Sequence, residues 1–125
     1  MPTPPSPPGA PIQIGVLVPL TRPGWVGAGR HLLAGLELAV RNVNLAGERP
    51  LELVVRDTAA DPQQAVAAVE ELAGLGVAAL VGEYHSVVAR AAAARADTIA
   101  RTAGNTFAAR ASRNHFASHF IGGSR

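Results

Sequence analysis

Short apolar runs alternate with longer amphipathic segments along most of this chain. The apolar runs lie at Ile12–Pro19, Leu51–Asp57 and Val77–Val81. The segments with helical periodicity are Gly27–Leu45, one that begins at Asp61-Pro62 and one that begins at Ser86. Strands that alternate with helices of this length are joined by right-handed crossovers and form a parallel sheet. We therefore expect an α/β fold, with three parallel strands in the order 2-1-3 and helices on both faces of the sheet.

The first apolar run and the helices around it carry further signals. Residues 12–18 are nearly all apolar, which is typical of a central parallel strand buried on both faces. At the start of the second helix Asp61 can cap, Pro62 suits the first helical position and Gln64 completes a capping box. In the first helix, the positions expected to form the buried stripe are Leu32, Leu36, Ala39, Val40 and Val43.

The alternation stops near Asp97, after a third helix that is expected to end at about Ala96. Thr98–Arg125 supplies no fourth apolar run, and all three phenylalanines of the chain lie there. Two explanations fit this change: a native disordered or partner-binding extension, and a frame shift or truncation that replaced the native continuation. We expect three parts, namely a flexible Pro-rich leader at 1–11, a partial α/β lobe at 12–97 and an irregular tail at 98–125.

Composition and charge exclude several classes of protein. The 125 residues suffice for one small domain with a core, and a chain without cysteine has neither a disulfide nor a thiolate metal site. No apolar stretch approaches the roughly 20 residues of a membrane span, and Met1–Pro11 lacks the apolar region of a signal peptide. Four of the 11 basic residues but only one acidic residue lie in 96–125, so the high isoelectric point reflects the tail. No nucleic-acid partner is expected.

A parallel sheet carries its functional loops at the carboxyl ends of its strands. In this chain those loops are Leu20–Val26, Thr58–Ala60 and Gly82–His85. We expect any binding site to lie among them.

Several stretches resemble a known family. The segments GVLVPLT at 15–21 and GLELAV at 35–40 look like the start of a type I periplasmic binding protein. More specific are LELVVRD at 51–57 followed by DPQQAV at 61–66, and GVAALVG at 76–82 leading to Ser86. In this order and spacing, they resemble the leucine/isoleucine/valine-binding branch of ABC-transporter receptors over residues 12–97.

The resemblance implies a Rossmann-like fold of two α/β lobes that clamp a ligand, of which this chain would hold an incomplete first lobe. It also implies that the Ser86 hydroxyl and nearby backbone N–H groups bind a ligand carboxylate, which suits the N-terminus of a helix. Trp25, in the loop after the first strand, would offer the ligand an aromatic surface. Tyr84 and His85, in the same loop as Ser86, would line the cleft.

These candidates also have purely structural interpretations. Ser86 would be an ordinary helix cap, and Trp25 would cover the edge of the sheet. Glu83 is expected to pair at the surface with Arg22 or Arg90.

Catalytic and metal chemistry find little support in the sequence. Ser86 and His85 are neighbours, which does not build a nucleophile–base pair, and Asp57 is expected only to shape a turn. Residues 24–29 do not meet the dinucleotide fingerprint. His115 and His119 are spaced like metal ligands on a helix but lack a third ligand, so no metal or other cofactor is expected.

The function that we derive from the sequence is ligand binding without chemistry. The chain is interpreted as a truncated substrate-binding protein of an ABC importer for branched-chain amino acids or related amides, with a membrane permease as partner. A cytoplasmic sensor for amino acids or amides on the same fold is the first alternative, and a small enzyme or a nucleic-acid-binding protein the second. The resemblance implies a periplasmic or cell-surface location, whereas the missing signal peptide favours the cytoplasm.

Overall fold

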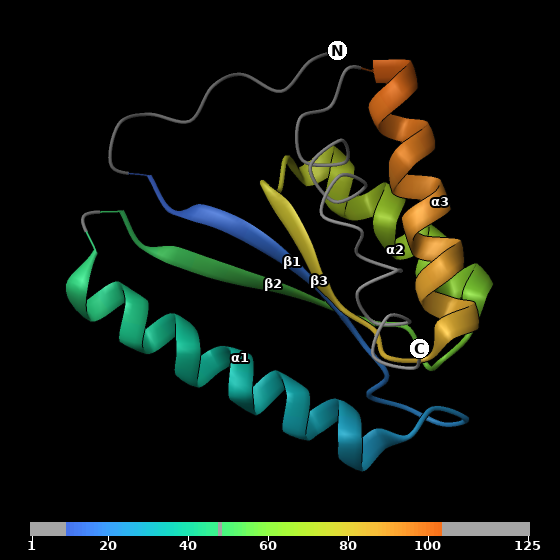
Figure 1. Ribbon diagram of the computed structural model, residues 1–125, viewed down its shortest axis with the longest axis horizontal. Helices are drawn as coiled ribbons and strands as arrows, with labels where there is room; N and C mark the ends of the chain where they lie inside the picture. The colour runs from blue at the N-terminus through green and yellow to red at the C-terminus, as the bar shows by residue number, and fades with distance from the viewer. Residues whose placement is uncertain (1–9, 48, 104–125) are drawn as a thin grey trace, which may run out of the picture.

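Three parallel strands and three helices alternate along the chain, as the sequence predicts. The computed structural model describes residues 10–47 and 49–103. The strands are β1 (Ile12–Val18), β2 (Leu51–Asp57) and β3 (Ala79–Gly82), and the helices are α1 (Val26–Ala46), α2 (Pro62–Leu75) and α3 (Ser86–Ala103). The sheet has the order β2-β1-β3 (Figure 1). The expected fold class and strand order are confirmed.

β1 is the central strand, and its carboxyl half is buried. It pairs with β2 from Ile12 opposite Leu51 to Val18 opposite Asp57. On its other edge it pairs with β3, and Leu17 lies opposite Gly82. Because both pairings are parallel and in register, all three strands end at the same edge of the sheet.

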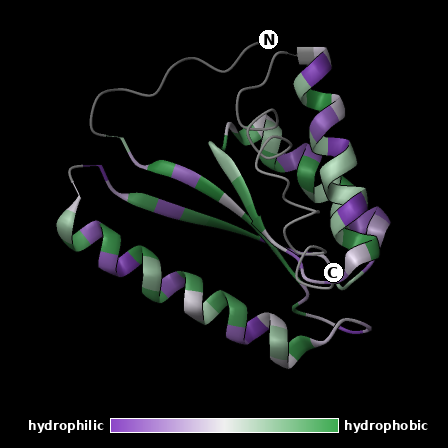
Figure 2. Cartoon of the chain, in the orientation of Figure 1, coloured by the Kyte–Doolittle hydropathy of each residue, from purple (hydrophilic) through white to green (hydrophobic). Residues whose placement is uncertain are grey.

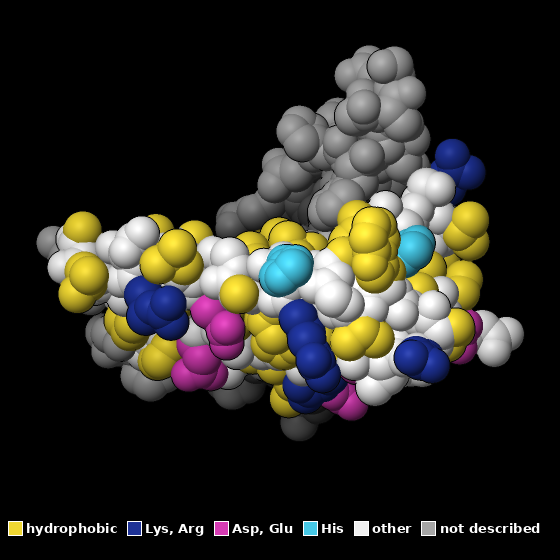
Figure 3. Space-filling model, turned by 90° about the horizontal axis from the view of Figure 1, so that it is seen from below, with side chains coloured by type: hydrophobic (Ala, Val, Ile, Leu, Met, Phe, Trp, Pro, Cys, Tyr) yellow, Lys and Arg dark blue, Asp and Glu magenta, His cyan; other side chains and the backbone are white. Residues whose placement is uncertain are grey.

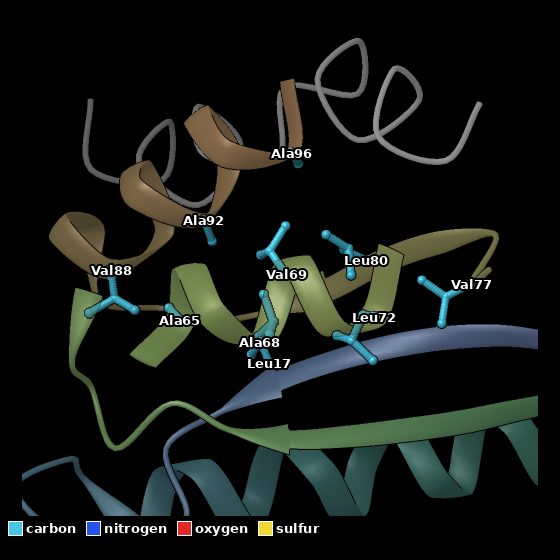
Figure 4. Packing of buried hydrophobic residues seen from close by; sticks show 10 residues of the cluster. All are labelled: Leu17, Ala65, Ala68, Val69, Leu72, Val77, Leu80, Val88, Ala92 and Ala96. Atoms are coloured by element: carbon cyan, nitrogen blue, oxygen red, sulfur yellow. The ribbon is translucent and has the colours of Figure 1, made fainter. Parts of the chain in front are cut away.

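The helices cover the two faces of the sheet unequally. α1 lies on one face, and α2 and α3 pack together on the other (Figure 1). Figure 4 shows that α2 lies between α3 and the sheet, with small and branched side chains filling the layers. The buried cluster on this side consists of Leu17, Ala65, Ala68, Val69, Leu72, Val77, Leu80, Val88, Ala92 and Ala96.

The face covered by α1 is packed more loosely. Gly29 is the one residue of α1 that is buried, and the expected stripe positions Leu32, Leu36 and Val40 are half-buried. Ala39 and Val43 are exposed, so the expected stripe is wrong at these positions. Green apolar and purple polar positions alternate closely along this helix (Figure 2), and yellow apolar side chains reach the surface on its side of the molecule (Figure 3).

The third helix extends further than expected. It continues to Ala103 instead of ending near Ala96, because Ile99 and Ala100 pack against the buried cluster and continue its apolar stripe. The remainder of the expected tail, with His115 and His119, lies outside the described residues. β3 covers residues 79–82, slightly later than the expected apolar run.

The start of α2 follows its sequence signals only in part. The Asp61 carboxylate accepts a hydrogen bond from the Gln63 N–H at 3.1 Å. Asp61 therefore caps α2, and Pro62 is the first helical residue. Gln64 does not complete a capping box, because its side-chain amide donates to the Asp57 carbonyl oxygen at 2.9 Å. This bond ties the first turn of α2 to the end of β2.

Within the described part of the chain, no helix combines the length and the apolar character that crossing a membrane requires.

Gly29→Ala should destabilise the fold because α1 packs directly on Pro19, the residue after β1, at this position. A Cβ atom there would overlap the carbonyl oxygen of Pro19, a backbone atom that cannot rotate away. Overpacking of this kind costs about 1–3 kcal/mol of unfolding free energy. Gly35→Ala in the same helix is the control, since its Cβ meets no atom within 4 Å and should stabilise by about 0.5–1 kcal/mol. Urea unfolding measures both, and equal effects would contradict the packing described.

Candidate functional site

The chain reverses its direction of winding at the carboxyl edge of the sheet. From β1 it crosses through α1 to β2 on one side, and from β2 it returns through α2 to β3 on the other side (Figure 1). The loops after β1 and β3 therefore leave toward opposite faces, and a switch point of this kind is where ligands bind in open α/β sheets. These loops are residues 19–25 and 83–85, and residues 58–61 form the loop after β2.

Asp57 connects the loop after β2 to the loop after β1. Its carboxylate accepts hydrogen bonds from the Leu20 N–H at 2.7 Å and from the Thr21 hydroxyl at 2.6 Å. It also accepts from the Ala59 N–H at 2.8 Å, which is the turn-shaping bond expected from the sequence. Asp57 thus shapes its own turn and, beyond that expectation, also holds the start of the neighbouring loop.

These bonds favour the ionised form of Asp57. Partial burial raises the pKa of this carboxyl group, but the hydrogen bonds from Thr21, Leu20 and Ala59 together outweigh burial. The net result is a pKa below the ordinary 3.8. The Asp57 side chain is therefore a carboxylate, and acceptor only, over the neutral range.

Glu83 connects the loop after β3 to the loop after β2, and it is fully buried. The Thr58 hydroxyl donates to one oxygen of its carboxylate at 2.6 Å, and the His85 N–H donates to the other at 3.2 Å. The expected surface ion pair with an arginine is wrong, because the side chain turns inward. Each of its two carboxyl oxygens accepts a hydrogen bond, as a buried polar group requires.

Backbone geometry explains why Glu83 turns inward. Gly82 has a φ of 121°, and a Cβ atom there would overlap the backbone of Leu17. The next residue, Glu83, also has a positive φ of 52°. Its N–H donates to the Leu17 carbonyl at 2.7 Å, and the Thr58 N–H donates to the Val18 carbonyl at 2.9 Å. Successive carbonyls of β1 therefore hold Thr58 and Glu83 on either side of the central strand.

Tyr84 connects the loop after β3 to the loop after β1. Its hydroxyl donates to the Trp25 carbonyl oxygen at 2.8 Å, and its ring lies 4.9 Å from the His85 ring at a tilt of 36°. Burial, and secondly the charge of nearby Glu83, raise the pKa of Tyr84 above the ordinary 10.0. The phenol therefore stays protonated and remains a donor at physiological pH.

Side-chain hydrogen bonds thus join the three loops pairwise. We call this set the loop network: Asp57 to Leu20 and Thr21, Glu83 to Thr58, and Tyr84 to Trp25. Each loop is bonded to both of the others. The network holds the three loops together without using the side chains of Trp25 and Ser86.

The structure brings the four residues singled out from the sequence to this edge. Trp25 occupies the N-cap position of α1 and is 69% exposed. Tyr84 joins it to the loop that leads to α3. His85 is half-buried, and among the described residues its Nε2 atom has no hydrogen-bond partner although it is buried.

Ser86 is exposed at the start of α3. The His85 carbonyl accepts the Ala89 N–H at 2.8 Å, so His85 holds the cap position and Ser86 is the first helical residue. The interpretation of Ser86 as a helix cap is therefore not supported. No hydrogen bond joins its hydroxyl to another residue in the part of the chain that the structure describes.

Glu83 and Thr58 are the residues that sequence reasoning missed. An acidic side chain after a strand normally lies in water, and only the preceding glycine hinted at an unusual backbone. Residues 10–47 and 49–103 hold no cluster of three His, Asp or Glu side chains suited to a metal ion. The arrangement offers the exposed Ser86 hydroxyl and the exposed Trp25 on hydrogen-bonded loops, which suits binding of a small molecule.

Comparison with protein families and known proteins agrees with a small-molecule binding site. The family model described as periplasmic binding protein matches residues 11–118. No curated protein matches the chain.

Solved structures with the same fold include three substrate-binding proteins of transporters. The branched-chain amino acid transporter protein LivJ from Streptococcus pneumoniae, in complex with isoleucine, is 27% identical with a TM-score of 0.66 and covers 70% of this chain. An ABC transporter substrate-binding protein from Sphaerobacter thermophilus is 33% identical (TM-score 0.60, 73% of this chain). A fatty acid ABC transporter substrate-binding protein from Thermomonospora curvata is 26% identical (TM-score 0.57, 71% of this chain). The match covers 26%, 24% and 23% of these proteins, so the chain spans about a quarter of their length.

Asp57→Asn should weaken the fold in a pH-dependent way. The lowered pKa means that the ionised carboxylate adds stability, which is fully present above the unfolded value of about 4 and is lost as pH falls through the lower folded value. At pH 7 the substitution should cost about 1–2 kcal/mol of unfolding free energy, after a discount for partial exposure. The gap from wild type should close below about pH 4.

Urea unfolding between neutral and acidic pH measures this gap. Asp61→Asn is the control, because asparagine caps helices as well as aspartate does, and it should leave neutral-pH stability almost unchanged. A constant gap between wild type and Asp57→Asn across the acidic range would show that the carboxylate hydrogen bonds do not stabilise the fold.

Proposed function

Because this chain belongs to the periplasmic binding protein family, we propose that it contributes the ligand-binding edge of one lobe in an ABC-transporter substrate-binding protein. The ligand that we assign is a branched-chain amino acid or a related amide, bound reversibly and without chemistry. The observation that carries the proposal is the exposed Ser86 hydroxyl at the start of α3, placed across the switch point from the exposed indole of Trp25.

The start of α3 supports binding of a carboxylate. The first N–H groups of a helix have no partner within the helix and lie at the positive end of its dipole. The first turn of α3 contains no acidic residue that would occupy these groups. The Ser86 hydroxyl adds a donor beside them, and a hydrogen bond to an ionised acceptor is stronger than one to a neutral group.

Apolar surface beside these donors supports a ligand with a hydrocarbon side chain. Trp25 is 69% exposed, and Val87, the residue after Ser86, is 64% exposed. Isoleucine, which is bound to the similar LivJ, and fatty acids, for which the similar Thermomonospora curvata protein is named, share a carboxylate joined to an apolar chain. The two features at this edge match the two halves of such a molecule.

Transport rather than catalysis is the role that the geometry favours. The Glu83 carboxylate binds the backbone N–H of His85 and not its ring, so it does not orient the imidazole as a base for Ser86. We propose that lobe closure on the ligand reports occupancy to a membrane permease, and that the protein acts in the periplasm or at the cell surface. A cytoplasmic sensor on the same fold would use the same edge.

The chain alone should bind branched-chain amino acids only weakly. This edge offers one side of a site, and small-molecule affinity depends on enclosing most of the ligand surface. Titration of the labelled chain with isoleucine, followed by amide NMR signals, should shift residues 24–26 and 83–88 without saturation in the micromolar range. Micromolar affinity, or shifts confined to another edge of the sheet, would contradict the proposed site.

Ser86→Ala should weaken this interaction while leaving the fold intact. The hydroxyl would donate to an ionised carboxylate, a bond worth roughly 1.5–3 kcal/mol, so affinity should fall about 10-fold or more. Stability should change little, because Ser86 is not the cap residue. Ser86→Thr keeps a hydroxyl at the same position and is the matched control. Unchanged isoleucine-induced shifts in Ser86→Ala would remove Ser86 from the site.

A further inference from the structure

Trp25 lacks the features that usually fix an exposed aromatic residue. It is the N-cap of α1, yet its side chain makes no capping hydrogen bond. The residue is 69% exposed, so its indole has little packing to hold it. Its carbonyl oxygen accepts the Gly29 N–H at 3.0 Å, which is the first hydrogen bond of the helix. Without a further contact, the position of the indole would depend on this first turn alone.

The Tyr84 hydroxyl supplies that contact. It donates to the same Trp25 carbonyl at 2.8 Å from a residue far away in sequence. Tyr84 is itself held in place on both sides. Its ring packs beside His85, and the preceding residue, Glu83, is fully buried and hydrogen-bonded to Thr58. The start of α1 is thereby bonded to the loop that contains the buried Glu83.

We propose that Tyr84 is a positioning residue that holds Trp25 at the ligand-binding edge through its hydroxyl. The benefit of this role rests on the proposed function: an indole that is already fixed loses less conformational freedom when a ligand packs on it. The positioning itself does not require a ligand. The positioning role and the proposed function can therefore be refuted separately, because an experiment without ligand can show that Tyr84 does not hold Trp25.

The chain offers two optical probes for a test, because it contains a single tyrosine and a single tryptophan. Ultraviolet absorbance of tyrosinate reports the ionisation of Tyr84 alone, and time-resolved fluorescence anisotropy reports the local motion of Trp25 alone. A phenolate cannot donate a hydrogen bond. Raising the pH through the elevated pKa of Tyr84 therefore removes the contact without any substitution. The charged and titratable groups beside Tyr84 are Glu83, which contributes to its raised pKa, and His85, whose ring lies next to its own; Arg22 lies on the loop that carries Trp25.

Wild type and Tyr84→Phe would be compared in the full 125-residue chain without ligand. At neutral pH the variant should show a wider angular range of Trp25 motion. Losing the hydrogen bond should raise the population of conformers in which the loop at residues 19–25 is detached from Tyr84 by roughly 2- to 10-fold. In wild type the angular range of Trp25 motion should increase by the same amount as Tyr84 ionises. In Tyr84→Phe the anisotropy should stay constant over the same pH range. Thr102→Val, which breaks a side-chain bond to Thr98 near the far end of α3, is the control and should leave Trp25 unchanged.

Two results would overturn the proposal. One is equal Trp25 motion in wild type and Tyr84→Phe at neutral pH. The other is an alkaline increase of the same size in both proteins, because that change would come from a group other than Tyr84. If Tyr84→Phe does not fold, the wild-type titration decides alone: Trp25 motion must rise with tyrosinate formation, and motion that is constant through it refutes the role.

Discussion

β1 pairs with β2 along one edge and with β3 along the other, and the site depends on this double pairing. The last carbonyls of β1 accept the N–H groups of Glu83 and Thr58, so the central strand brings together two residues from separate loops. Once these lie side by side, the Thr58 hydroxyl reaches the Glu83 carboxylate at 2.6 Å. A buried carboxylate without such a donor would be costly. The strand pairing of β1 and the hydrogen bond that buried Glu83 requires therefore favour the same arrangement of the loops.

The loop network gives this edge a different character from the rest of the molecule. On the α2–α3 side, stability comes from small apolar side chains in close contact, and on the α1 side packing is loose. At the carboxyl edge, the contacts are directional hydrogen bonds that the Asp57 and Glu83 carboxylates accept and the Tyr84 hydroxyl donates. Directional contacts fix geometry more than they add stability. This suits a surface that has to present Ser86 and Trp25 to a ligand.

The sequence predicted the fold well because its signals are local and repeated. Alternating periodicity, the Asp61-Pro62 helix start and the apolar β1 run were sufficient for element order, strand order and the edge that carries the candidate residues. The length of α3 was underestimated because Ile99 and Ala100 continue its stripe only sparsely. Glu83 was misplaced for a physical reason: its burial depends on the backbone of Gly82 and on Thr58, and neither contact is visible from residue type. The bond from Tyr84 to Trp25 likewise joins residues whose proximity depends on the whole sheet.

The central claim is that three loops act as one unit, and a double-mutant cycle tests it most directly. Thr21→Val removes the hydroxyl that donates to Asp57, and Tyr84→Phe removes the one that donates to Trp25. The two side chains bond to different partners and are connected through the loop at residues 19–25. If the loops form one unit, the effects on unfolding free energy should be non-additive by about 0.5 kcal/mol or more. Additivity within about 0.3 kcal/mol would show independent contacts and contradict the account.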